Sequence, residues 1–322
     1  MSTKSFSNPA LEGAFSDRFG SHVKFNERLA PHMAYRIGGP ADILVFPETE
    51  AELVWLAACA KENNLPITVV GTGTNLLVRD KGIRGITVAL FSAFKKITLL
   101  GDKGPGEVWV KAEGGVEKPT LLNWSIDQNL AGLEFSSGVP GTIGGGIFMN
   151  AGTKYGCYAD ILKDLRLFDF ATGAKTLTRE EAHFGYRHQT AVKNQLVISA
   201  TFCLKKGEGA AVRTERDRII AERAEKQPLD FPSCGSTFKN PEGHSAGRLI
   251  EKSGLKGTTV GGAEISLKHA NFLLNKGNAK ASDILTLIGM IKAEVLKQFG
   301  VPLECEVIVL GEPDENEIPH PH

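Results

Sequence analysis

The chain has 322 residues, enough for about two domains. Its 37 Lys and Arg residues balance 37 Asp and Glu residues, so it lacks the excess of positive charge expected of a nucleic-acid-binding protein. Hydrophobic residues make up 42% and charged residues 23%, which excludes a disordered chain. Glycine is in excess, with 36 residues or about 11% against the usual ~7%, and many backbone sites must therefore need positive φ or a close approach.

Cysteine usage and hydropathy indicate the compartment. The five cysteines are scattered and contain no C-x-x-C pair, so they predict neither a disulfide framework nor a zinc site. The first twenty residues lack the apolar segment of a signal peptide, and no segment reaches the ~18 apolar residues of a spanning helix. We therefore expect a cytoplasmic protein with no metal and no membrane contact. The oligomeric state stays open, and a monomer is compatible with the sequence.

The first part of the chain predicts a small α/β unit. We expect a flexible tail over residues 1–21 and a first subdomain over residues 22–95. Thr49 and Glu52 form a T-x-x-E capping box that begins a helix with one apolar face. Strand-like segments surround this helix, and they are residues 41–46, 66–70 and 86–90.

Two further units follow. A second subdomain is expected over residues 96–206, and its predicted elements are strands at 108–112 and 196–204, a helix at 120–129 and a glycine-dense stretch at 132–156. The charged residues 210–226 predict a solvated connecting helix. It opens a third unit over residues 207–311, with helices at 245–252 and 282–299 and a closing strand at 303–310. The acidic, proline-containing tail 312–322 is expected to be disordered.

A glycine-rich loop, Gly-Thr-Gly-Thr-Asn-Leu at residues 71–76, follows a predicted strand. It begins like the dinucleotide-binding G-x-G-x-x-G fingerprint, but the third glycine is replaced by Leu76 and a strand follows where that motif needs a helix. No P-loop motif occurs either. Exposed amides and threonine hydroxyls could still hold a phosphate without a lysine. Taken alone, this loop is better explained as a tight turn between strands.

A second glycine-rich loop favours a phosphate site over a simple turn. Residues 138–146, Gly-Val-Pro-Gly-Thr-Ile-Gly-Gly-Gly, precede Asn150-Ala151-Gly152. Two glycine loops with few cations suit a buried dinucleotide whose pyrophosphate is held by the backbone, although turns at the edge of a β-sandwich are the alternative. The predicted cofactor-binding residues of the two loops are Gly71, Thr72, Gly73, Thr74, Asn75, Leu76, Gly138, Gly141, Thr142, Gly144, Gly145, Asn150 and Ala151.

Eight motifs occur in an order that resembles the UDP-N-acetylenolpyruvoylglucosamine reductases, also called UDP-N-acetylmuramate dehydrogenases, which make peptidoglycan precursors. The resemblance spans residues 30–311. The motifs are residues 36–42 (RIGGPAD), 71–77 (GTGTNLL), 132–152 (GLE through GVPGTIGGG to MNAG), 184–187 (FGYR), 235–241 (GSTFKNP), 245–250 (SAGRLI), 268–272 (KHANF) and 303–307 (LECEV).

The resemblance implies a mixed α/β and α+β architecture. An FAD-binding unit of the vanillyl-alcohol-oxidase type, made of two subdomains, would be followed by an α+β substrate domain. Ser236 follows Arg187 by only 49 positions, which matches the shorter, type II form. The implied reaction passes hydride from NADPH to FAD and then to UDP-N-acetylglucosamine enolpyruvate. NADPH rests on the resemblance alone, since no motif for its 2′-phosphate is visible.

The resemblance also implies roles for single residues. Hydride addition to an enol ether places negative charge beside the carboxylate, and that charge must be stabilised and then protonated. Arg187 would hold the carboxylate, Ser236 would donate the proton, and Glu306 would polarise the substrate or orient the proton relay. Without the resemblance, these residues would be explained as a surface ion pair, a turn serine and an exposed strand residue. Arg36 would contact FAD, and the expected substrate contacts are Tyr186, Lys239, Asn240 and Asn271.

Several positions depart from the family pattern. Met33-Ala34 stand where threonines are usual, Gln189 where a serine is usual, and Glu264 where a glutamine is common. Two alternatives remain. An FAD-dependent oxidase of the same superfamily could use both glycine loops on another alcohol or sugar, and a non-catalytic paralogue could bind a nucleotide without turnover.

Overall fold

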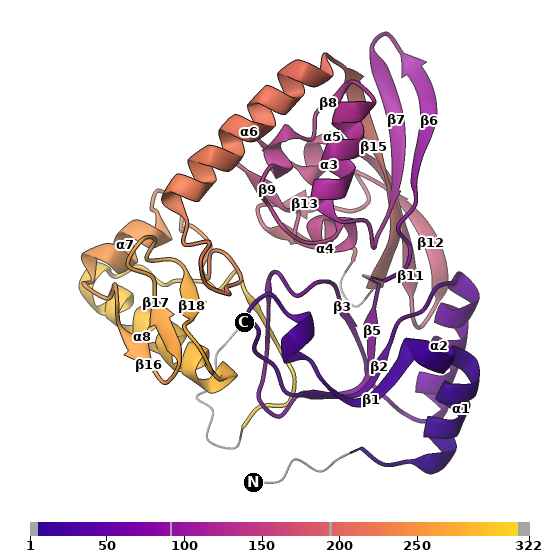
Figure 1. Ribbon diagram of the computed structural model, residues 1–322, viewed down its shortest axis with the longest axis horizontal. Helices are drawn as coiled ribbons and strands as arrows, with labels where there is room; N and C mark the ends of the chain where they lie inside the picture. Colours follow the sequence, from indigo (N-terminus) through magenta and orange to yellow (C-terminus); the bar gives the residue numbers. More distant parts are fainter. Residues whose placement is uncertain (1–5, 91, 193–194, 315–322) are drawn as a thin grey trace.

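The computed structural model describes residues 6–90, 92–192 and 195–314, which form three units (Figure 1). In the figure, the N-terminal unit lies below the second unit, and α6 leads along the second unit to the C-terminal unit. No helix in these ranges is long and apolar enough to cross a bilayer.

The N-terminal unit is a four-stranded sheet in the order β1-β2-β5-β3, with β2, β5 and β3 parallel. The Thr49 hydroxyl caps α2 by accepting from the Glu52 amide at 3.2 Å, which confirms the predicted helix start. The elements are α1 (Pro9–Phe19), η1 (Gly20–His22), β1 (Val23–Arg28), η2 (Ala30–His32), β2 (Pro40–Val45), α2 (Glu50–Glu62), β3 (Ile67–Val70), β4 (Leu76–Val78) and β5 (Ile83–Ala89).

Helix α1 was not expected. The prediction of a flexible tail over residues 1–21 is wrong for Pro9–Phe19, and residues 1–5 lie outside the described residues. Leu11, Phe15 and Phe19 recur every four residues and are buried, and the Phe15 ring meets Trp55 of α2 edge-on at 5.0 Å. This segment forms a helix because its apolar face is covered by α2.

The second unit is built on an antiparallel sheet in the order β12-β11-β15-β7-β6, with β8 beside β15. Its core lies between this sheet and the helices α3 and α4, with Val110, Leu121 and Ile143 fully buried. The elements are β6 (Ile97–Gly104), β7 (Glu107–Glu113), α3 (Lys118–Asp127), β8 (Leu130–Ala131), η3 (Glu134–Ser136), α4 (Ile143–Phe148), β9 (Gly152–Thr153), β10 (Gly156–Cys157), α5 (Tyr158–Ile161), β11 (Leu162–Asp169), β12 (Gly173–Thr178), β13 (Phe184–Gly185), β14 (His188–Gln189) and β15 (Gln195–Lys206).

The C-terminal unit packs helices against a three-stranded sheet, β16-β17-β18. The apolar face of α8 is buried, and the helix ends at Gly300, whose φ of 68° is the left-handed cap predicted from the sequence. The elements are α6 (Gly209–Lys226), α7 (Ala246–Lys252), β16 (Thr259–Val260), β17 (Ala263–Ile265), β18 (Leu273–Asn275), α8 (Ala281–Phe299) and β19 (Ile308–Leu310).

The end of the chain returns to the N-terminal unit. Strand β19 pairs in parallel with β4, so the predicted closing strand 303–310 is regular only over its last three residues. The Glu312 amide donates to the Gly82 carbonyl at 2.8 Å, and the predicted disordered tail is therefore wrong at this residue. Residues 315–322 of that tail lie outside the described residues. Apart from the β19–β4 pair, each sheet of the described residues falls within one of the three predicted ranges, while the boundaries themselves stay predictions.

Candidate active site

The first glycine loop connects β3 to β4. Gly73 has a φ of 66°, and a Cβ on it would lie 2.5 Å from the Met33 sulfur, so only glycine fits there. Met33, one of the departures from the family pattern, thus supports the loop by packing. The Thr72 hydroxyl is buried and has no hydrogen-bond partner among the described residues. A buried hydroxyl normally has a partner, so this group is available to bind a ligand.

The second glycine loop precedes α4. Gly141 has a φ of 111°, and the Thr142 hydroxyl caps α4 by accepting from the Gly145 amide at 3.3 Å. Gly144 and Gly145 therefore belong to a short helix and not to the loop. A Cβ on Gly144 would lie 3.1 Å from the Gly114 carbonyl oxygen, so its glycine allows close packing.

The two glycine loops face each other. A Cβ on Gly71 would lie 3.2 Å from the Thr142 hydroxyl, and a Cβ on Gly141 would lie 2.7 Å from the Thr74 hydroxyl. The loops thus form one site across two units, lined by glycines and small hydroxyl side chains. Together with the unpartnered Thr72 hydroxyl, this lining fits a cofactor diphosphate held by main-chain amides.

Two cations that the sequence analysis missed lie at this junction. Lys118 is only 5% exposed, and burial, with repulsion from Arg223 and Arg187, lowers its pKa to about 7. The Arg223 side chain lies 3.1 Å from the position of a Cβ on Gly138, and its buried Nε lacks a partner in the described part of the chain. Arg223 belongs to α6, so the prediction of a solvated connecting helix is wrong at this residue.

Arg187 lies in the turn between β13 and β14. It has a φ of 53°, and the Asn150 side chain fixes the turn by donating to the Gly185 carbonyl at 2.9 Å. The Arg187 Nε donates to Glu306 at 2.8 Å and a terminal nitrogen donates to the Gly152 carbonyl at 2.7 Å. The two ionised side chains are 20% and 18% exposed, so this is not a surface ion pair.

Glu306 is held by its backbone as well. Its amide donates to the Thr237 carbonyl at 2.8 Å, and its carbonyl accepts from the Asn75 side chain at 2.9 Å. Burial raises the pKa of the Glu306 carboxyl above its ordinary value, although Arg187 and Lys239 oppose that shift. The Glu306 side chain is only 18% exposed, which excludes the alternative of an exposed strand residue.

Ser236 lies next to Thr237, the residue that pairs with Glu306. It is half-buried, follows Gly235 at a φ of 73°, and forms an isolated bridge with Phe272. The structure therefore brings Arg187 and Glu306 into contact, and Ser236 directly precedes Thr237, whose carbonyl accepts from the Glu306 amide.

Comparisons with known proteins agree with this geometry. Residues 41–177 match the model of an FAD binding domain, and residues 227–310 match the C-terminal domain of UDP-N-acetylenolpyruvoylglucosamine reductase. The reductase from Clostridium botulinum is 42% identical over 91% of this chain and 94% of its own length. The chain belongs to the UDP-N-acetylenolpyruvoylglucosamine reductase family. It is an FAD-dependent oxidoreductase, and the predicted family and fold are confirmed.

Further relatives cover the same span. The reductase from Pediococcus pentosaceus is 43% identical over 94% of this chain and 99% of its own length. Among solved structures, the reductase from Thermus caldophilus superposes with a TM-score of 0.73 at 32% identity and covers 89% of this chain and 97% of its own. The family likeness thus extends through all three units.

The four residues predicted to contact the substrate of this reductase-family chain differ in their exposure and in their partners. Tyr186 is 57% exposed. The Arg187 guanidinium carbon lies 5.2 Å from the centroid of the Tyr186 ring. Lys239 pairs with Glu304, and the Asn240 oxygen accepts from the first amide of α7 at 3.0 Å. Both ends of the Asn271 amide bind the Phe238 backbone, at 2.9 and 2.8 Å, and this is a structural role.

Other positions singled out by the sequence have local partners. Arg36 is exposed and donates to the Pro31 carbonyl at 2.9 Å. Gln189 accepts from the Val192 amide at 2.6 Å. The Glu264 carboxylate lies 3.6 Å from the Lys276 ammonium, so its extra negative charge is offset locally.

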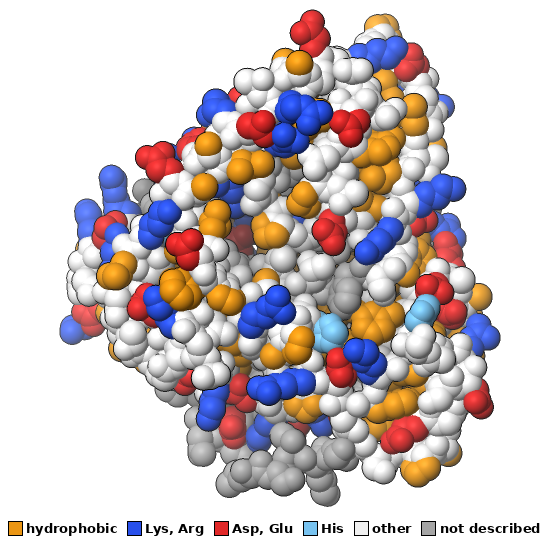
Figure 2. Space-filling view, viewed as in Figure 1, with side chains coloured by type: hydrophobic (Ala, Val, Ile, Leu, Met, Phe, Trp, Pro, Cys, Tyr) orange, Lys and Arg blue, Asp and Glu red, His pale blue; other side chains and the backbone are white. Residues whose placement is uncertain are grey.

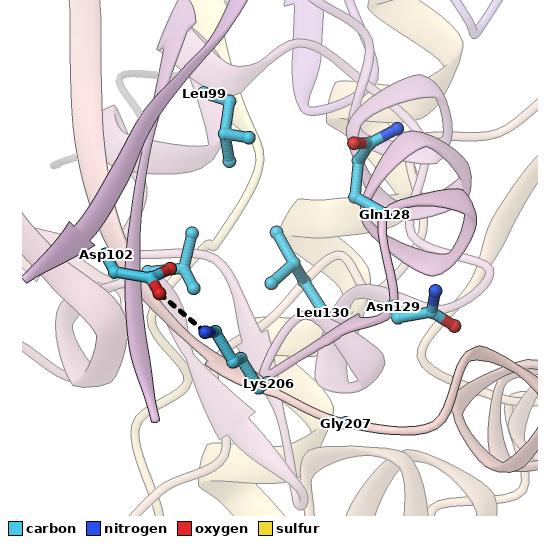
Figure 3. Close-up of a pocket in the computed structure, with 8 residues that line it drawn as sticks. Leu99, Asp102, Gln128, Asn129, Leu130, Lys206 and Gly207 are labelled. Atoms are coloured by element: carbon cyan, nitrogen blue, oxygen red, sulfur yellow. Dashed lines mark hydrogen bonds and ion pairs between the residues drawn. The ribbon is translucent and has the colours of Figure 1, made fainter. Parts of the chain in front are cut away.

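The surface of this reductase-family chain carries mixed charges and one hollow, and the hollow does not include the predicted site residues. Figure 2 shows acidic and basic side chains interspersed over one face, in keeping with the zero net charge. A hollow of about 320 Å³ lies between β6, α3 and the end of β15 (Figure 3), with Asp102 and Lys206 paired in its wall. It contains none of the predicted cofactor, substrate or catalytic residues.

Proposed function

We propose that this chain is a cytoplasmic, NADPH-dependent flavoenzyme that reduces UDP-N-acetylglucosamine enolpyruvate to UDP-N-acetylmuramate for peptidoglycan synthesis. The observation that carries the proposal is the partly buried Arg187–Glu306 pair, at 2.8 Å, beside two facing glycine loops. Family membership supplies the substrate class, because the relatives named above are reductases of this nucleotide sugar.

Arg187 is oriented to receive the substrate carboxylate. Its bonds to Glu306 and to the Gly152 carbonyl fix the plane of the guanidinium and leave further N–H groups of its five for a ligand. A fixed, planar donor stabilises negative charge that develops on the carboxylate better than a mobile one, since it needs no reorganisation. Arg223, with its unpartnered Nε, would add positive charge for the anionic nucleotide sugar.

Ser236 and Glu306 would handle the proton. Hydride addition at the alkene carbon distal to the carboxylate leaves negative charge on the neighbouring carbon, and the Ser236 hydroxyl would protonate that carbon. A serine hydroxyl is a weak acid, so this step needs a strongly basic carbon in a site shielded from water. Glu306, buried beside Arg187, would polarise the substrate or orient the Ser236 hydroxyl.

The cofactor would lie along the two glycine loops. The amides of residues 71–75, those of Gly138, Gly141 and Thr142, and the Thr72 hydroxyl would hold its diphosphate. FAD, when bound there, supplies a carrier that accepts hydride from NADPH and passes it to the enolpyruvyl group.

The test is an anaerobic assay on purified protein. We expect a yellow protein whose flavin absorbance is bleached by NADPH and restored by UDP-N-acetylglucosamine enolpyruvate. Recovery with oxygen but not with the enolpyruvyl sugar would contradict the proposal and favour the oxidase alternative. Failure to bind flavin at all would favour the nucleotide-binding paralogue. Substituting NADH for NADPH in the same assay tests the choice of reductant.

A further inference from the structure

Lys118, the first residue of α3, extends its side chain to the junction of the two glycine loops. Its Cδ lies 3.4 Å from the position of a Cβ on Gly146, and its Nζ lies 3.3 Å from the position of a Cβ on Gly141. That second position is also 2.7 Å from the Thr74 hydroxyl of the first loop. The ammonium thus lies where the two loops meet, and the residue is only 5% exposed to solvent.

This ammonium lacks the partner that a buried lysine normally has. No hydrogen bond or ion pair joins it to any residue in the ranges that the structure describes. Its charged neighbours are Arg223 from α6 and Arg187 from the β13–β14 turn, both of which repel it, and Tyr158 of α5 packs near its stem without offering charge. A buried cation without a partner is costly, so an anion from outside the chain would stabilise this arrangement.

The surrounding groups indicate which anion this is. The Glu306 carboxylate of the site is already bound by Arg187, and the charged groups that act on Lys118 are both cations. The remaining groups at the junction are glycine amides, the Thr74 hydroxyl and the unpartnered Thr72 hydroxyl, which together suit phosphate oxygens.

We propose that Lys118 binds the diphosphate of FAD, so that this chain holds its cofactor with a buried side-chain cation in addition to amides and hydroxyls. The inference rests on the FAD binding of the proposed function. It differs from the sequence-based hypothesis, in which amides and threonine hydroxyls hold the phosphate without a lysine.

The test compares Lys118→Met with Lys205→Met, a matched exchange at an exposed lysine in the same unit. Titration of apoprotein with FAD, followed by flavin fluorescence, should show affinity for Lys118→Met reduced about 10-fold or more, as expected for a charged hydrogen bond. Lys205→Met should match wild type. The midpoint potential of bound flavin should stay unchanged, because a diphosphate carries the same charge in both redox states.

Two further readouts separate binding from folding. Removing a buried, unpaired charge should leave the melting temperature of the apoprotein equal or higher, while the rise in melting temperature on adding FAD becomes smaller. Because the diphosphate favours the charged ammonium, FAD binding at pH 8 should take up protons in wild type and fewer in Lys118→Met. Calorimetry in two buffers of different ionisation enthalpy measures this difference.

The possible failures are distinguishable. If wild type itself does not bind FAD, the proposed function fails. If wild type binds FAD and Lys118→Met binds it equally well, only the present inference is overturned. A changed midpoint potential with unchanged affinity for oxidised FAD would place the charge at the isoalloxazine ring and would also overturn it.

Discussion

The Arg187 guanidinium and the Glu306 carboxylate lie 2.8 Å apart although 119 positions separate them in the chain. Arg187 belongs to the second unit, and Glu306 belongs to the segment that returns from the C-terminal unit to strand β4. The pair therefore forms only when these units dock, which makes the arrangement of the units part of the active site.

The first prediction concerns Arg187→Lys. An ammonium cannot reach both Glu306 and the Gly152 carbonyl in the geometry of the guanidinium, so a partly buried charge-assisted hydrogen bond is lost. We expect kcat for the enolpyruvyl substrate to fall by about 10- to 100-fold, the range for such a bond. Reduction of the flavin by NADPH should change little, and stopped-flow absorbance measures both half-reactions.

A matched control is Arg166→Lys. Arg166 also binds a glutamate through its guanidinium, Glu50 at 2.7 Å, but both side chains are 40% exposed. Exposed ion pairs contribute little, so this variant should retain nearly full turnover. Equal turnover in Arg187→Lys and wild type would show that Arg187 has only a structural role.

The second prediction concerns the pKa of Glu306. Burial raises it and Arg187 is the nearest group that lowers it, so Arg187→Met should raise this pKa further. At neutral pH the ionised fraction of Glu306 then falls. As the pH is lowered, any step that needs the carboxylate is therefore lost at a higher pH in the variant than in wild type. Carbon-13 NMR of labelled glutamate, assigned with Glu306→Gln, measures the shift. Lys239→Met should give a smaller rise, and an unchanged or lower pKa in Arg187→Met would refute this electrostatic account.

The third prediction concerns the facing loops. Gly141→Ala places a methyl group 2.7 Å from the Thr74 hydroxyl at a φ of 111°, so the Thr74 side chain must shift and the backbone of the second loop is strained. We expect the purified variant to lose most of its FAD, measured as the ratio of flavin to protein absorbance. Gly101→Ala is the control, because Gly101 also has positive φ, 90°, but open space around its Cβ position. Full FAD content in Gly141→Ala would mean that the cofactor does not depend on this contact.

Much of the site could be predicted from ordered motifs, because Arg187, Ser236 and Glu306 belong to local sequence patterns. Helices α2 and α8 were predictable for a similar reason, since Thr49 and Gly300 mark a helix start and a helix end within a few residues. In each case, the residues that identify the feature lie within a short segment of the chain.

The missed features depend on contacts between distant segments. Arg223 occurs in a highly charged helix, and only the packing of α6 against Gly138 shows that its side chain is buried. Lys118 has no motif, and its role is visible only where the loops at Gly141 and Thr74 meet. Helix α1 likewise depends on α2 to cover Phe15.

The most direct measurement is the anaerobic reoxidation of NADPH-reduced enzyme by UDP-N-acetylglucosamine enolpyruvate, in wild type and in Ser236→Ala. If Ser236 protonates the substrate carbon, the variant should be reduced by NADPH at the wild-type rate and reoxidised at least about 100-fold more slowly, as expected for loss of a general acid. Reoxidation of Ser236→Ala at the wild-type rate would contradict the convergence of Arg187, Ser236 and Glu306 on one substrate carbon.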